Sequence, residues 1–144
     1  MGFDLPLYYI VGVVPVKFLR TQDGRMVVLK MDKRGHWVYG NDMLYSALFG
    51  TSDVEEVSEA EFIQHVEKMR GQRLTREGSV YDLYAVIQAM EEVAQEEGRR
   101  LTPQEQTILH ELRCHTHELF EASLPPFPEE EDDIVSADPP ADTS

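Results

Sequence analysis

The sequence is poor in cysteine and lacks the long apolar segments that anchor proteins in membranes. It has one cysteine, Cys114, in 144 residues, so an internal disulfide is impossible and a reducing compartment is expected. No apolar stretch approaches the length of a membrane span. The apolar residues near the N-terminus lack the basic segment that precedes the core of a signal peptide. We therefore expect a cytoplasmic protein without a membrane partner.

Catalytic signatures are also missing. The sequence contains no Gly-x-Ser-x-Gly element, no Walker loop and no Gly-x-Gly-x-x-Gly turn, which are the short motifs that place nucleophiles or phosphates. Carboxylates are too numerous and too evenly spread to single out an acid–base pair. We therefore expect that the protein is not an enzyme, and that it has no catalytic residue and no cofactor.

Positive charge is scarce and unevenly placed. The chain has 13 Lys and Arg against 27 Asp and Glu, a formal net charge of −14. Residues 1–40 hold six basic and three acidic residues, residues 77–128 hold three and ten, and the chain after Pro128 holds seven acids and no base. Phosphate binding needs clustered cations, and a negative surface attracts basic partners. We expect a protein partner with a basic surface and no direct contact with nucleic acid.

The first 40 residues have the pattern of an antiparallel meander. Residues 7–20 are rich in β-branched and aromatic side chains and predict one long strand, in which Gly12 and Pro15 indicate a bulge or an edge position. Asp23-Gly24 is a strong hairpin signal, and two further strands are expected at 25–32 and 36–39. Residues 54–57 are either loop or a short extra strand.

The rest of the chain has helical periodicity. A short helix is expected to be capped by Asn41 or Asp42, and a second to run from Ser58 to a stop at Gly71. A third is expected to be capped by Ser79 and closed by Gly98. Thr102, Pro103 and Glu105 form the start of a fourth, a capping box with proline at the first helical position. On this fourth helix the apolar residues expected to share one face are Ile108, Leu109, Leu112, Leu119 and Phe120.

Strands followed by helices predict an α+β fold. We expect one domain over residues 1–127, in which the antiparallel β-meander packs against the C-terminal helices. The last two helices are expected to form an antiparallel hairpin, because their connection is short. Residues 128–144 are predicted to be a disordered acidic tail, since they are rich in Pro and charge and poor in aromatics. The oligomeric state is not predicted.

Metal-ligand types gather on the fourth predicted helix. His110, Cys114, His117 and Glu121 are spaced so that they line one stripe, roughly opposite the apolar face. A straight helix usually presents only two ligands to one metal, and the zincin pattern His-Glu-x-x-His is absent. A polar face rich in histidine is the alternative interpretation. We predict no metal site, and a metal-dependent enzyme on this face is kept as a third functional alternative.

Two sets of residues are candidates for binding a partner. The first set is Trp37 and Tyr39, which lie in the mildly basic meander. Such aromatic side chains can belong to the core, and the negative net charge of the chain opposes their stacking on nucleic-acid bases. If they are exposed, they favour a protein interface, where Trp and Tyr are enriched. The second set is an acidic segment with a small apolar centre, which could become ordered against a basic groove of a partner or could only confer solubility. It consists of Glu129, Glu130, Glu131, Asp132, Asp133, Ile134 and Val135.

These features favour a non-enzymatic protein-binding regulator or inhibitor, whose acidic face and tail dock on a basic surface of a nucleic-acid-handling protein. In size and charge the chain is similar to small bacterial immunity proteins and to small phage-encoded regulators of host transcription. That similarity is one of bulk properties and transfers no residue roles. The alternative function is a structural or assembly chaperone for a basic client, which predicts a large exposed apolar patch on the isolated protein.

Overall fold

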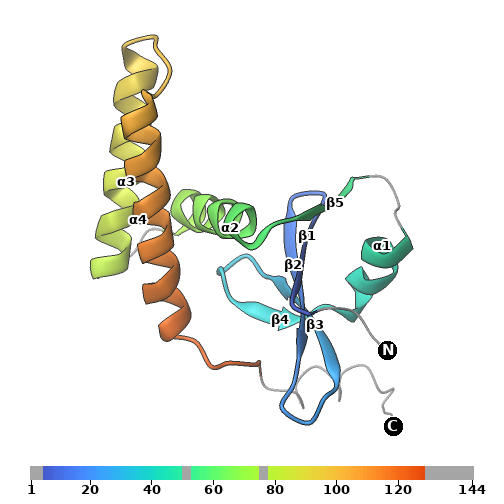
Figure 1. The fold of residues 1–144 in the computed structure, drawn as a ribbon. Helices are drawn as coiled ribbons and strands as arrows, with labels where there is room; N and C mark the ends of the chain where they lie inside the picture. Colours follow the sequence, from blue (N-terminus) through green and yellow to red (C-terminus); the bar gives the residue numbers. More distant parts are fainter. Residues whose placement is uncertain (1–4, 50–52, 75–77, 129–144) are drawn as a thin grey trace, which may run out of the picture. The chain divides into compact units, whose positions relative to one another are not determined.

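The protein has an α+β fold, as the sequence predicts (Figure 1). The computed structural model describes residues 5–49, 53–74 and 78–128. Its strands are β1 Leu7–Val11, β2 Val14–Arg20, β3 Met26–Met31, β4 Trp37–Tyr39 and β5 Val54–Val57. They form one antiparallel sheet in the order β4-β3-β2-β1-β5. The short strand at 54–57 is thus present, and it pairs with β1.

The helical elements are η1 Asn41–Met43, α1 Leu44–Phe49, α2 Glu59–Arg73, α3 Ser79–Glu96 and α4 Pro103–Ala122. Contacts divide the chain into two compact units. The sheet unit contains the described residues up to Asp32, His36–Glu59 and residues 125–128. The helical unit contains Lys33–Gly35 and Ala60–Leu124. A single domain over 1–127 stays a prediction. Within the described ranges, no helix has both the length and the hydrophobicity needed to cross a membrane.

The predicted long first strand is in fact two strands. Gly12 and Val13 form a tight turn that pairs Val11 with Val14. Gly12 has φ +65°, a left-handed conformation that glycine adopts without a steric penalty. The edge position inferred from Pro15 is also wrong, because β2 is the central strand. Pro15 is tolerated because it pairs only with β1: the ladder with β3 begins one residue later, at Val16.

One buried cluster of the sheet unit lies on a single face of the sheet. Phe18 and Val28 are directly paired across β2 and β3, and both are buried with Val16. Ala47 of α1 packs against them, and Tyr9 meets Phe18 with ring centroids 5.3 Å apart. The alternation of apolar side chains along β2 therefore places one face of the sheet against α1.

Two predicted helix ends differ from the structure. Helix α2 continues through Gly71 to Arg73. A Cβ on Gly71 would lie 3.3 Å from the Tyr84 ring, so this glycine permits the close approach of α3 instead of ending α2. Ser79 is the first residue of α3, and Gly78 is its N-cap, without a side-chain hydrogen bond. The glycine at 98 does end α3 as predicted, with φ +67°.

The start of α4 follows the sequence prediction closely. The Thr102 hydroxyl accepts a hydrogen bond from the Glu105 backbone N–H at 3.1 Å, and the Glu105 carboxylate accepts one from the Thr102 N–H at 2.9 Å. Arg99 also donates to this carboxylate at 2.8 Å. The hydrogen bond from Arg99 and the one from the Thr102 N–H together lower the pKa of Glu105 to about 2. The α3–α4 connection is thus held by a set of local polar contacts.

Thr102→Ala is expected to destabilise the protein by about 1 kcal/mol, within the range of about 0.5–2 kcal/mol for lost N-caps. The substitution leaves one N–H at the start of α4 without its intramolecular acceptor. Urea unfolding followed by circular dichroism measures the change, and Thr102→Ser, which keeps the hydroxyl, is the matched control. Equal losses for the two variants would contradict a capping role.

Candidate functional site

A buried carboxylate lies at the centre of the helical unit. Glu67 of α2 has no exposed side-chain surface and accepts four hydrogen bonds. Oε1 accepts from the hydroxyls of Tyr84 and Thr116, each at 2.7 Å. Oε2 accepts from Arg70 at 2.7 Å and lies 2.9 Å from Nδ1 of His117. An ionised carboxylate only accepts, so the His117 Nδ1 carries the proton. One carboxylate therefore links α2, α3 and α4.

Arg70 completes this cluster. Its Nε and Nη2 donate to the carbonyl oxygen of Gly35 at 3.0 and 2.6 Å, and Nη2 donates to Glu121 at 2.7 Å. Its guanidinium lies 3.9 Å from the centroid of the Phe120 ring. Gly35 has φ +79°, and a Cβ there would lie 3.0 Å from the Arg70 Cγ, so this position requires glycine. Each nitrogen of the guanidinium therefore donates at least one hydrogen bond.

The cluster sets the ionisation of its members. Burial alone would raise the pKa of Glu67, but the hydrogen bond from His117, the charge of Arg70 and the two hydroxyl donors outweigh it and hold that pKa below its ordinary value. Burial and the neighbouring Glu67 charge raise the pKa of Tyr84 well above its ordinary value. Glu67 is therefore ionised and Tyr84 neutral at physiological pH. With four donors around the Glu67 carboxylate, the cluster stabilises the packing of three helices.

The sequence analysis did not identify this cluster, although a signal for it exists. Arg70 follows Val66 by four residues and Phe62 by eight, which places it on the apolar face of α2. On α4, Arg113 and Thr116 occupy the buried stripe between Leu109 and Phe120. Ile108 and Leu119, expected to share that buried stripe, are instead exposed. The signal in the sequence was therefore a charged residue, such as Arg70, at a position where the helical spacing predicts a buried side chain.

The histidine-rich stripe of α4 is divided between two roles. His117 and Glu121 belong to the buried cluster, whereas His110 and Cys114 are exposed. Gln64 of α2 donates to the His110 carbonyl oxygen at 3.2 Å. Among the residues that the structure describes, no group of three or more His, Cys, Asp or Glu side chains is arranged to hold a metal ion.

The exposed charges of the α3–α4 hairpin are mostly negative. Helix α3 contains no Lys or Arg, and the single cation of α4, Arg113, is buried and bonded to Glu91 at 3.0 Å. The exposed carboxylates of the two helices therefore have no exposed Lys or Arg beside them within these elements. They include Asp82, Glu92, Glu96, Glu111 and Glu118.

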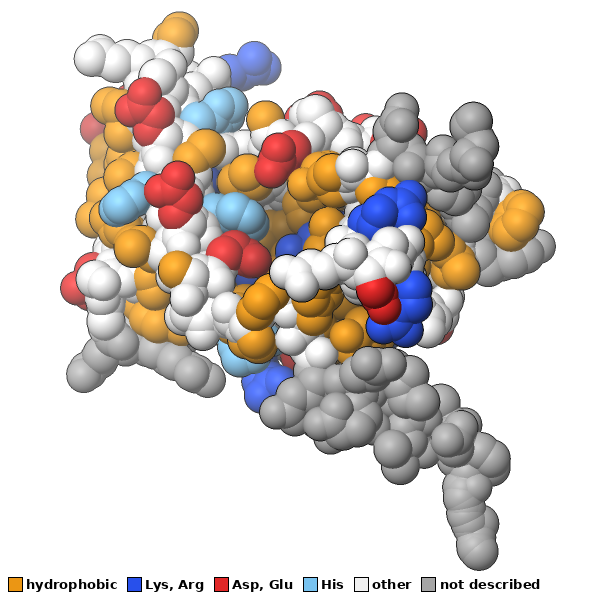
Figure 2. All heavy atoms as spheres, turned by 60° about the horizontal axis from the view of Figure 1, so that its bottom comes forward, with side chains coloured by type: hydrophobic (Ala, Val, Ile, Leu, Met, Phe, Trp, Pro, Cys, Tyr) orange, Lys and Arg blue, Asp and Glu red, His pale blue; other side chains and the backbone are white. Residues whose placement is uncertain are grey.

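The same hairpin exposes apolar side chains at helical spacing. Val86 and Val93 of α3 are 48% and 45% exposed, and Ile108 and Leu119 of α4 are 40% and 37% exposed. We call these four residues, with the half-buried Leu83, Met90 and Leu112, the apolar stripe. Figure 2 shows hydrophobic side chains along the left edge of the view, where the hairpin lies, with Asp, Glu and His side chains beside them. The hairpin surface thus combines apolar area with negative charge.

The predicted partner residues of the meander have different surroundings from those expected. Trp37 is only 8% exposed, and the Lys17 ammonium lies 4.1 Å from its ring centroid, so the expected exposure of Trp37 is wrong. Tyr39 is half-buried, and its hydroxyl donates to the Pro128 carbonyl oxygen at 3.2 Å. Contact of these two residues with a partner stays a prediction.

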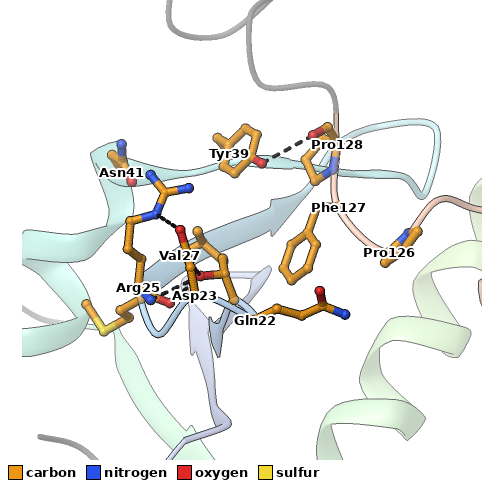
Figure 3. Close-up of a pocket in the computed structure, with 11 residues that line it drawn as sticks. Gln22, Asp23, Arg25, Val27, Tyr39, Asn41, Pro126, Phe127 and Pro128 are labelled. Atoms are coloured by element: carbon orange, nitrogen blue, oxygen red, sulfur yellow. Dashed lines mark hydrogen bonds and ion pairs between the residues drawn. The ribbon is translucent and has the colours of Figure 1, made fainter.

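Tyr39 lines a hollow of about 760 Å³ in the sheet unit (Figure 3). Phe127 and Pro128 line it too, together with Arg25, which is paired with Asp23 at 3.1 Å. Tyr39 therefore holds the chain beside the sheet at the residue that precedes the predicted acidic segment. That segment, from Glu129 to Val135, lies outside the described residues.

Comparisons with protein-family models, with curated proteins and with solved structures find no match to this chain.

Proposed function

We propose that this protein is a non-enzymatic regulator or inhibitor that docks a negatively charged surface on a basic surface of another protein. The observation that carries the proposal is the charge of the α3–α4 hairpin. Its exposed acids lie on two helices whose single cation, Arg113, is buried and already paired. Such a surface attracts cationic proteins and repels phosphate backbones.

A nucleic-acid-handling protein is the partner class that this chemistry fits best. Proteins that bind phosphate backbones carry clustered Lys and Arg. The hairpin presents carboxylates along two helices of 18 and 20 residues, and could cover such a cationic surface. Occupation of that surface would exclude nucleic acid sterically and electrostatically. The acidic segment after Pro128 would extend the same contact.

Affinity capture with the full chain and with a version ending at Phe127 tests the proposal, with partners identified by mass spectrometry. We expect one basic protein to be retained, and the affinity of the purified pair to fall steeply with salt, since the Debye length shortens from about 10 Å at 0.1 M to about 3 Å at 1 M. Loss of the partner only with the shorter version would assign a role to the acidic segment.

Matched charge variants locate the contact. Glu111→Gln with Glu118→Gln removes two exposed acids from α4, and Glu55→Gln with Glu56→Gln removes two exposed acids from β5. We expect about 3- to 10-fold weaker binding for the α4 pair and little change for the β5 pair. A full chain that retains no specific protein, or equal effects of the two pairs, would refute the proposal.

The apolar stripe favours a second candidate, an assembly chaperone for a basic client. A chaperone of this kind keeps apolar area exposed until its client arrives. Light scattering of the retained partner separates the two functions: a chaperone prevents aggregation of the free partner, whereas an inhibitor blocks nucleic-acid binding by a partner that is soluble alone.

A further inference from the structure

The two halves of the apolar stripe lie on the same side of the α3–α4 pair. On α4, the groups bonded to Glu67 and Arg70 of α2 are Thr116, His117 and Glu121. At 3.6 residues per turn, Ile108 and Leu119 lie nearly half a turn around that helix from His117 and Glu121. Thr116 lies between these two sides and is fully buried.

The same reasoning applies to α3. Tyr84 and Gln88 bond to α2, through Glu67 and the Gly71 carbonyl oxygen. Val86 and Val93 lie at least a third of a turn away from both. The stripe is therefore the side of the hairpin that faces away from α2.

Negative charge borders this stripe on both helices. On α3, Asp82 precedes Val86 by four residues and Glu96 follows Val93 by three, spacings that make them neighbours on the helix surface. On α4, Glu111 follows Ile108 by three residues. Glu118 follows Glu111 by seven residues and therefore lies on the same side of the helix. All four carboxylates are exposed. The surface has an apolar centre with an acidic border on each long side.

We propose that the apolar stripe is a docking surface for a basic amphipathic helix of the partner protein. Apolar residues of that helix at i, i+3 or i+4, and i+7 would pack along Val86, Val93, Ile108 and Leu119, as amphipathic helices do in apolar grooves. Lys and Arg on the flanks of that helix would meet the acidic border. The inference rests on the proposed function and assigns its site and the shape of the ligand.

Charge decides between this occupant and a second copy of the chain. A symmetric dimer through the stripe would bring the acidic borders of two molecules together, in a chain whose net charge is −14. Neither α3 nor α4 has an exposed Lys or Arg that could pair with those carboxylates. A helix flanked by cations removes the repulsion and covers the same apolar area.

A synthetic peptide tests the proposal on the full chain. The peptide is as long as α3, with Leu at the positions of one helical face and Lys elsewhere, and its counterpart has Glu in place of Lys. Methyl NMR of the labelled protein reports where the peptide binds, and calorimetry gives the affinity. We expect shifts of the Val86, Val93, Ile108 and Leu119 methyl groups with the Lys peptide and none with the Glu peptide.

One substitution separates docking from simple charge attraction. Val86→Asp adds negative charge inside the stripe, whereas Ala85→Asp adds the same charge at an exposed position beside it. Docking predicts about 10-fold or more weaker binding for Val86→Asp and unchanged or slightly tighter binding for Ala85→Asp. Equal tightening by both variants, or shifts confined to other surfaces, would overturn the proposal.

A dimer in sedimentation that Val86→Asp dissociates would overturn the proposal too and assign the stripe to a second copy. The capture experiment remains independent of these results. A retained natural partner whose affinity Val86→Asp leaves unchanged would refute helix docking on the apolar stripe while supporting the acidic docking function.

Discussion

Arg70→Met is expected to lower the free energy of unfolding by about 3–5 kcal/mol, the cost of leaving one member of a buried ion pair without its counter-charge. Glu67 has no exposed side-chain surface and would lose its cation. The Gly35 carbonyl oxygen and the Glu121 carboxylate would lose their donors as well. Methionine fills a similar volume, so the loss reports charge and hydrogen bonds more than packing. Urea unfolding followed by circular dichroism measures it.

Two further variants assign the effect to the ion pair. Arg73→Met changes an exposed arginine near the end of the same helix and should cost less than about 0.5 kcal/mol. Glu67→Leu combined with Arg70→Met removes both charges, and should recover part of the stability lost by Arg70→Met alone. A loss for Arg70→Met no larger than that for Arg73→Met would show that the cluster does not stabilise the protein.

The stability lost by Arg70→Met is expected to depend on pH in a definite direction. In the wild type, the pKa of Glu67 is lowered, because the donors around it outweigh its burial. Its contribution is therefore present above the unfolded-state pKa, near 4.5, and is lost as the pH falls through the lower folded-state pKa. Without Arg70 that pKa rises, so the carboxyl protonates more readily and becomes neutral. The stability difference between wild type and Arg70→Met should then narrow as the pH falls below about 5.

The local elements of the fold were predictable because their determinants are local. The box formed by Thr102 and Glu105 involves groups three residues apart, and Asp23-Gly24 needs only a tight turn. The division of the first strand at Gly12 was missed, because a glycine within an apolar run fits a bulge and a turn equally well. The continuation of α2 through Gly71 depends on Tyr84, which is distant in sequence and could not be inferred from local spacing.

Of the candidate site, only the negative charge was predictable from the sequence. Counting charges along the sequence located the acidic hairpin, since composition needs no structure. The α4 half of the apolar stripe was assigned to the core instead, because Ile108 and Leu119 are apolar residues at helical spacing. Its exposure follows from the buried stripe that contains Arg113 and Thr116, two residues that a polarity rule places outside. Buried polar groups thus displaced apolar side chains to the surface of α4.

Phe18→Ala is expected to destabilise the sheet unit by about 3–5 kcal/mol, as large-to-small changes of fully buried aromatics do. Phe18 has no exposed surface, pairs with Val28 and Leu7 across both neighbouring strands, and contacts the Tyr9 ring. Fluorescence of Trp37, the one tryptophan, follows the sheet unit during urea unfolding. Phe18→Leu retains most of the apolar contact and is the control, with a smaller loss expected.

The same experiment tests whether the chain is one cooperative domain. Circular dichroism at the helical band mainly follows α2, α3 and α4, since these are the longest helical elements. One domain over residues 1–127 requires the fluorescence and dichroism transitions of Phe18→Ala to coincide, and both to shift together from those of the wild type. A fluorescence transition that moves to lower urea while the dichroism transition stays in place would show that the sheet unit and the helical unit unfold separately. The single-domain prediction would then be wrong, and the free energies measured for Arg70→Met would belong to the helical unit alone.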